Sequence, residues 1–211
     1  METQLLEKLR WRYACKKFDA SKKLSPQKLQ LLKEAFNLTA TSYGLQPLKM
    51  MVIGDEELKA QLVQHSMNQL QVRDASHLLV LCIEDEVNEA FIKGHFQRVG
   101  NIRDTSRSIL EPYEKALIHS FAQKKDEEIR HWMINQAYLA LGNMLTVCAV
   151  EDIDACPMEG FEPEHYDRIL GLQELGLKSV LVLPVGYRAD DDFFATLKKV
   201  RRGVEDVIIE L

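Results

Sequence analysis

Two uninterrupted apolar runs, residues 76–83 (SHLLVLCI) and 179–187 (SVLVLPVGY), constrain the fold of this chain more than any other feature. A strand with one solvent-facing side would alternate polar and apolar residues, and these runs do not. Each run therefore predicts a strand that is covered on both faces. A chain of 211 residues is long enough to bury about 70% of its unfolded surface around such strands.

The segments around these runs alternate irregularly between strand and helix patterns. Shorter strands are predicted at 47–53 and 153–156, and helices at 3–10, from Ser25-Pro26 to Leu38, from Gly54-Asp55 to Gln64, and at 163–170. Residues 86–129 are helical in tendency, with interruptions expected at Gly94, Gly100 and Pro112. The order lacks the regular alternation of a doubly wound sheet, so we predict an α+β layer fold. No linker interrupts the chain, so we predict a single domain that spans residues 1–211.

The longest uncharged stretch, residues 132–150, has nearly the length of a membrane span. It contains Asn135, Gln136 and Asn143, whose amides would each need a partner in hydrocarbon. A helix buried in a core or a subunit interface is the better interpretation, without a membrane partner. The strand-like tail 204–211 has few local partners, and we expect it to reach another subunit.

Four cysteines stand far apart with no CxxC pair, and the N-terminus has no apolar signal core. Both features favour reduced thiols and a cytoplasmic protein. The net charge of −5 argues against nucleic acid as the main partner, since no stripe of the chain is strongly basic.

Two short cationic runs lie at opposite ends of this acidic chain, at residues 10–17 (RWRYACKK) and 198–202 (KKVRR). If the fold brings them together, their guanidinium and ammonium groups form a site for a phosphate. If it does not, each run is a solvated surface. A charge run taken alone favours the second alternative.

Several catalytic signatures are missing from the chain. It has no GxGxxG after a strand, no Walker loop, no HExxH and no GxSxG, and its six histidines show no metal-binding spacing. We therefore predict no metal site and no catalytic side chain. A phosphate site without a nucleophile or metal indicates that a bound organic cofactor performs the chemistry.

Five blocks in order resemble the FMN-dependent nitroreductases, most closely the oxygen-insensitive NAD(P)H nitroreductase and dihydropteridine reductase type. They are residues 12–19 (RYACKKFD) with 23–26 (KLSP), 40–47 (ATSYGLQP), 68–76 (NQLQVRDAS), 157–161 (PMEGF) and 199–201 (KVR). Each block alone is weak, but the ordered set covers the chain from end to end.

The resemblance implies a homodimer with a central, mostly antiparallel sheet flanked by helices, and a C-terminal strand exchanged between subunits. It also implies FMN as cofactor, NADH or NADPH as electron donor, and a small flat aromatic acceptor such as a nitroaromatic, a quinone or a pterin. Hydride would arrive at flavin N5 and leave to the acceptor in a ping-pong cycle. Residues 91–125 would shape the acceptor pocket.

The implied cofactor residues fall into groups with different roles. Arg12, Lys199 and Arg201 would hold the phosphate, Lys16 would face the N1–C2 carbonyl edge of the ring, and Asn68 would bind its pyrimidine edge. Ala40, Thr41, Ser42 and Gly44 would come from the second subunit, and the backbone amides of Glu159 and Gly160 would point at N5 and O4. Tyr13, Ala14, Gln71, Pro157 and Met158 complete the set.

Three departures from the family pattern bear on the cofactor site. Ala14 replaces a hydroxyl residue, Gln71 stands where a lysine can contact the pyrimidine carbonyl, and Leu48 replaces an aromatic residue. Alternatives are a non-catalytic flavin-binding module, a reductive dehalogenase or desaturase of the same fold, and a helical interaction protein built on residues 132–150.

Overall fold

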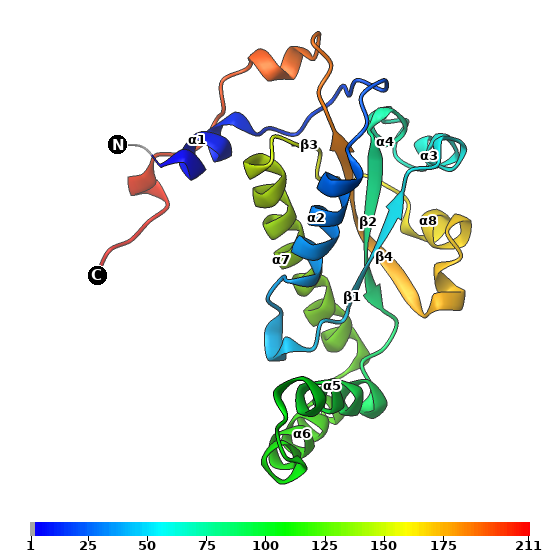
Figure 1. Cartoon of the computed structure of the whole chain (residues 1–211), viewed down its shortest axis with the longest axis vertical. Coiled ribbons are helices and arrows are strands. Elements are labelled where there is room, and N and C mark those ends of the chain that lie inside the picture. The colour runs from blue at the N-terminus through cyan, green and yellow to red at the C-terminus, as the bar shows by residue number, and fades with distance from the viewer. Residues whose placement is uncertain (1–2) are drawn as a thin grey trace.

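A four-stranded antiparallel sheet lies at the centre of the chain (Figure 1), which a computed structural model describes over residues 3–211. Its strand order is β1-β2-β4-β3, with β1 at Leu48–Ile53, β2 at His77–Glu84, β3 at Asp154–Ala155 and β4 at Leu177–Gly186. Every neighbouring pair is antiparallel. The strands predicted at 47–53, 76–83, 153–156 and 179–187 and the predicted α+β class are confirmed.

The register of β2 against β4 explains the two apolar runs. Leu79 pairs with Leu183, and Leu81 with Leu181, and all four belong to one hydrophobic cluster. The alternate residues, such as Val80 opposite Val182, belong to a second cluster. Because successive side chains point to opposite faces, both faces of these strands are buried.

Helices cover both faces of the sheet. On one side lie α2 (Pro26–Asn37) and α7 (Asp126–Val150), and on the other α3 (Glu56–Val63), α4 (Gln71–Asp74) and α8 (Pro163–Ile169), followed by the short turn η2 (Leu172–Leu175) (Figure 1). The predicted helix starts are confirmed. The Ser25 side chain accepts a hydrogen bond from the Lys28 amide, and Asp55 accepts one from Leu58.

Helix α7 packs one face against β2, β4 and α2. Its Gln136 and Asn143 side-chain amides are satisfied within the fold. Gln136 donates to the Trp132 carbonyl, and Asn143 donates to the Ala35 carbonyl and the Thr39 hydroxyl. Within the described chain, α7 alone has the length and composition of a membrane-crossing helix, a property that core helices share. Its other face leaves Tyr138 and Leu139 exposed.

The predicted interruptions in residues 86–129 are wrong. Gly94 and Gly100 lie inside α5 (Glu89–Arg103), and Pro112 lies inside α6 (Arg107–Ala122). The chain breaks instead at Asp104, which adopts the left-handed conformation. A Cβ on Gly100 would lie 3.5 Å from Leu110 of α6, an ordinary contact distance, so the space there does not require a glycine. One lost hydrogen bond at Pro112 is outweighed by the burial of Leu117 and Phe121 on the same helix.

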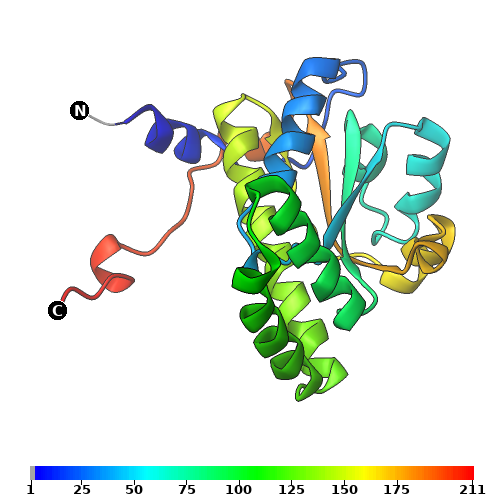
Figure 2. The ribbon, with the colours of Figure 1, turned by 60° about the horizontal axis from the view of Figure 1, so that its bottom comes forward.

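The two ends of the chain extend from the same side of the body and diverge (Figures 1 and 2). The N-terminal end forms α1 (Gln4–Trp11), and the tail contains two single turns, η3 (Phe193–Thr196) and η4 (Val204–Asp206). Residues 187–211 form no strand in this chain. The strand predicted at 204–211 is wrong, because its first residues form the turn η4. Without a neighbouring strand, the segment has no ladder of hydrogen bonds that would hold it extended.

Candidate functional site

The two cationic segments meet in one pocket, which confirms that the fold brings them together. The pocket has a volume of about 550 Å³, and the predicted residues that line it are Arg12, Tyr13, Ala14, Lys16, Lys199 and Arg201. Two bridges direct the N-terminal segment there, because Ala14 pairs with Ala155 and Phe18 with Arg188. The Lys199 ammonium donates to the Arg12 carbonyl and so attaches the tail to the same place.

The pocket brings together three cations, Arg12, Lys199 and Arg201. Burial and the neighbouring Arg201 both lower the pKa of Arg12. Burial, Arg12 and Arg201 lower the pKa of Lys199. In residues 3–211, no acidic side chain pairs with any of these three cations. Mutually repelling cations in a partly buried pocket fit a phosphate, whose oxygens would relieve the repulsion.

Asp192 holds the two segments together, and the sequence reasoning missed it. Its side chain is 4% exposed. It accepts hydrogen bonds from the Tyr13 hydroxyl at 2.8 Å and from the backbone amides of Lys16, Lys17 and Phe194 at 3.1, 3.3 and 3.2 Å. Burial by itself would raise the pKa of Asp192, but these hydrogen bonds outweigh it and lower the pKa.

Arg188 is a second residue that the sequence reasoning missed. Its guanidinium bonds the buried carboxylate of Asp154 at 2.8 Å and lies over the rings of Trp11 and Tyr13, 4.3 and 4.6 Å from their centres. The Arg188–Asp154 ion pair therefore holds the two rings that form the aromatic wall of the pocket. Its only sequence signal is its position directly after a buried strand.

Lys16 connects the pocket to a second cluster deeper in the fold. Its ammonium lies 3.5 Å from the Cys156 sulfur, and the Gln71 amide lies 4.0 Å from the same atom. Gln71 is 5% exposed and donates to the Gln69 side chain. Burial raises the pKa of the Cys156 thiol, and the nearby Lys16 opposes that shift. The structure thus brings Lys16 and Gln71 together.

Residues 157–160 and the loop around Asn68 lie against each other. After Pro157, Met158 pairs with Val182 through both backbone bonds and is 4% exposed. Gly160 accepts a hydrogen bond from Gln69, and a Cβ on Gly160 would come within 3.1 Å of the Met67 sulfur. The close approach explains the glycine.

In this region the Glu159 side chain has a protein partner, whereas two backbone amides have none among residues 3–211. The Glu159 carboxylate accepts a bond from Tyr138 at 2.7 Å. Over the described residues, the Glu159 and Gly160 amides donate to no protein acceptor, which leaves them available to a ligand. Asn68 has a left-handed backbone and turns the loop toward Gly160.

The segment 40–44 lies away from this pocket. Ser42 donates its amide to Gln136 of α7, and the Thr41 hydroxyl accepts from Gln46 in a local turn, η1 (Ser42–Gly44). Gly44 has a positive φ, and a Cβ there would meet His95. Within one chain, Ala40, Thr41, Ser42 and Gly44 form the polar turn between helix and strand and do not line the pocket. Their role in a partner's site stays a prediction.

A cationic pocket in an antiparallel α+β fold is suited to a phosphorylated organic cofactor. The sequence pattern of the nitroreductase family matches residues 9–187. This chain belongs to the nitroreductase family.

Relatives match over nearly their whole length. The oxygen-insensitive NAD(P)H nitroreductase of Salmonella typhimurium is 32% identical, with 95% of this chain and 96% of the relative covered. The major NAD(P)H-flavin oxidoreductase of Aliivibrio fischeri is also 32% identical, with 99% of each chain covered. Among solved structures, one from Exiguobacterium sibiricum in complex with FMN has a TM-score of 0.85 at 19% identity, covering 100% of this chain and 99% of that chain.

Proposed function

We propose that this chain uses FMN to pass electrons from NADH or NADPH to small flat aromatic acceptors, such as nitroaromatics, quinones or pterins, in a ping-pong cycle. One observation carries the proposal: Arg12, Lys199 and Arg201 converge on one pocket, where burial and the neighbouring cations lower the pKa values of Arg12 and Lys199. As a member of the nitroreductase family, the chain is an FMN- and NAD(P)H-dependent oxidoreductase.

The residues of the pocket fit FMN in size and charge. Three charge-assisted bonds to its phosphate would contribute about 5–9 kcal/mol before the costs of binding. A micromolar complex needs about 8 kcal/mol net, so the cations alone do not account for tight binding. Contacts with the ring must supply the remainder.

Bound FMN would supply the hydride chemistry, and the protein would position and polarise it. The Lys16 ammonium would stabilise negative charge on the N1–C2 carbonyl edge, because it is a cation held beside Gln71 and Cys156 at the inner end of the pocket. Asn68 would bind the pyrimidine edge, and the Glu159 and Gly160 amides would face N5 and O4. Gln71, an amide where relatives can carry a lysine, would stabilise the reduced ring less.

A homodimer completes this proposal, with two equivalent sites at the subunit interface and residues 40–44 reaching the partner's cofactor. The tail carries an exposed apolar series, which includes Phe193, Leu197, Val204, Ile208 and Ile209. Exposed apolar area of this extent on an arm that leaves the body marks an interaction surface. Four buried free cysteines fit a reducing compartment, and we place the enzyme in the cytoplasm.

We expect the purified protein to be yellow and to lose its oxidised-flavin absorbance when NADH or NADPH is added without oxygen. Adding a nitroaromatic or a quinone should restore the absorbance, because the acceptor takes the electrons back. A yellow protein that neither nucleotide reduces would instead indicate a non-catalytic flavin module. A colourless protein would favour the interaction-protein alternative.

We also expect the full chain to sediment as a dimer. The Ile208→Ser, Ile209→Ser double variant should form a weaker dimer, with a larger dissociation constant. The reason is the loss of apolar burial, about 25 cal/mol per Å². Analytical ultracentrifugation over a dilution series gives the dissociation constant. The matched control is Glu205→Ser, Glu210→Ser in the same tail, which should leave it unchanged. A monomeric full-length protein would contradict the dimer proposal.

A further inference from the structure

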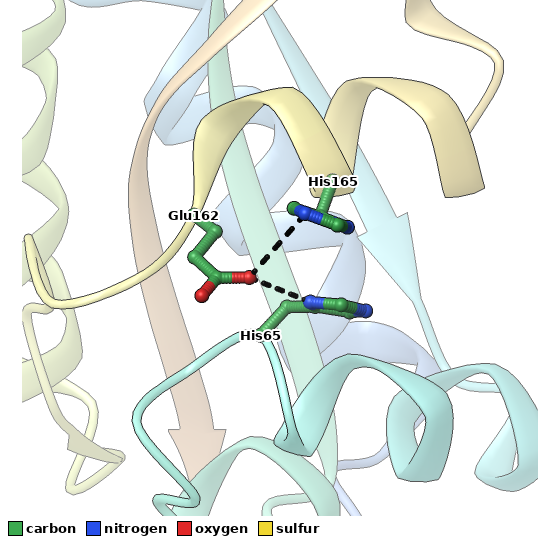
Figure 3. A group of neighbouring side chains, drawn as sticks. All are labelled: His65, Glu162 and His165. Atoms are coloured by element: carbon green, nitrogen blue, oxygen red, sulfur yellow. Dashed lines mark hydrogen bonds and ion pairs between the residues drawn. The ribbon is translucent and has the colours of Figure 1, made fainter.

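Two histidines far apart in the chain meet a glutamate on the α3–α8 side of the sheet (Figure 3). Glu162 points one carboxylate oxygen at both imidazoles, 2.7 Å from Nδ1 of His65 and 3.8 Å from Nε2 of His165. The two rings are stacked, with centres 4.1 Å apart and planes 14° from parallel. All three ligand atoms lie within 4.8 Å of one another.

The backbone holds these residues in place independently of their side chains. The Glu162 amide donates to the His65 carbonyl at 2.9 Å, which joins the end of α3 to the start of α8. His165 follows Glu162 by three positions at the helix start, so both side chains share one face. The fold therefore brings the three residues together without an ion.

We propose that His65, Glu162 and His165 form a zinc-binding site. Two imidazole nitrogens and one carboxylate oxygen are a known ligand set for Zn²⁺ that leaves one coordination position open. Ligand atoms at about 2.1 Å from a tetrahedral ion are about 3.4 Å apart. The two distances from Glu162, 2.7 and 3.8 Å, bracket that separation. Because the rings are stacked, one imidazole must rotate out of the stack before both nitrogens can point at one ion.

A simple ion pair accounts for less of this geometry. The Glu162 carboxylate lies at hydrogen-bond distance from His65 but 3.8 Å from His165, so a hydrogen bond accounts for one of the two contacts only. A divalent cation between the three groups satisfies both nitrogens and the oxygen at once. The side chains of His65, His165 and Glu162 are 16%, 41% and 57% exposed, so an ion reaches them from solvent.

The site is separate from the cationic pocket, since none of its three residues lines it. It does connect the two segments that touch through Gln69 and Gly160. Zinc would therefore stabilise the contact between the 65–69 loop and the 157–162 loop. Because the ligands are borderline nitrogen donors, Mg²⁺ should bind far more weakly.

The test uses tag-free, full-length protein that has been treated with a chelator and then titrated with zinc chloride by calorimetry. We expect one zinc per chain and a melting temperature that rises with zinc concentration. His165→Ala should weaken zinc binding by at least about tenfold. The matched control, His119→Ala on the exposed surface of α6, should bind as the unchanged protein does.

Glu162→Gln serves as a second variant, because it keeps the size of the side chain and removes the charge. It should also weaken zinc binding, and magnesium chloride should leave the melting temperature unchanged. Zinc binding that survives both substitutions overturns the proposal. So does the absence of any zinc-dependent shift at millimolar concentration.

Discussion

The Arg12→Ala, Arg201→Ala double variant should purify as a folded but colourless protein. Both guanidiniums line the pocket and have no acidic partner in residues 3–211, so their removal leaves no buried carboxylate unpaired. Two lost charge-assisted bonds correspond to about 3–6 kcal/mol, or about 10²- to 10⁴-fold in the FMN dissociation constant. Flavin absorbance per chain and titration of the apoprotein with FMN measure the loss.

The controls separate charge from local structure. Arg202→Ala removes a cation next to Arg201 that does not line the pocket, and it should retain the flavin. Arg12→Lys keeps the charge but not the fork geometry and should bind with intermediate affinity. A double alanine variant with a full flavin spectrum would refute the phosphate assignment.

The Asp192→Ala variant should lose both stability and flavin. The buried carboxylate accepts from the Tyr13 hydroxyl and from three backbone amides, so its removal leaves several donors unsatisfied. We expect a loss of about 3–4 kcal/mol in the free energy of unfolding, measured with a chemical denaturant. Affinity for FMN should fall as well, because the Lys16 segment and the tail would be held together by fewer bonds.

Asp191→Ala is the matched control for Asp192→Ala. Asp191 is 70% exposed and pairs with the exposed Lys17, so its loss should change stability by less than about 0.5 kcal/mol. If Asp192→Ala does not fold, Asp192→Asn keeps one acceptor and should show a smaller loss in the same direction. Equal stability of Asp192→Ala and the unchanged protein would contradict the role of this carboxylate.

The pH dependence of stability gives an independent reading of the same residue. Hydrogen bonds lower the folded-state pKa of Asp192 below its unfolded value. Its stabilisation is therefore present at neutral pH and disappears as the pH falls through the folded pKa. The stability difference between Asp192→Asn and the unchanged protein should shrink over that acidic range.

Local signals predicted most elements because their causes are local. Ser25 and Asp55 cap helices with their own side chains, and the runs at 76–83 and 179–187 carry enough apolar residues to fill both faces of a sheet. The interruptions at Gly94, Gly100 and Pro112 failed for the opposite reason. There, packing between α5 and α6 overrides the weak helix propensity of single residues.

Some residues of the candidate site could likewise be predicted from the sequence, and others could not. Arg12, Lys16, Lys199 and Arg201 could be named from residue type and from the ordered family blocks, because cations near a phosphate are a chemical requirement. Asp192 and Arg188 could not, because an aspartate in the run 190–192 looks like solvated charge until its neighbours are known. His65 and Glu162 are 97 positions apart, which no spacing rule detects.

By itself, the sequence determined the α+β class, the two strands that are buried on both faces, and the chemistry of the two cationic ends. Only the tertiary structure decided that those ends share a pocket, that Asp192 joins them, and that two histidines face one glutamate. The physical reason is that propensity and capping act over a few residues. Burial, pKa shifts and ligand geometry depend instead on partners that the folded chain brings from distant positions.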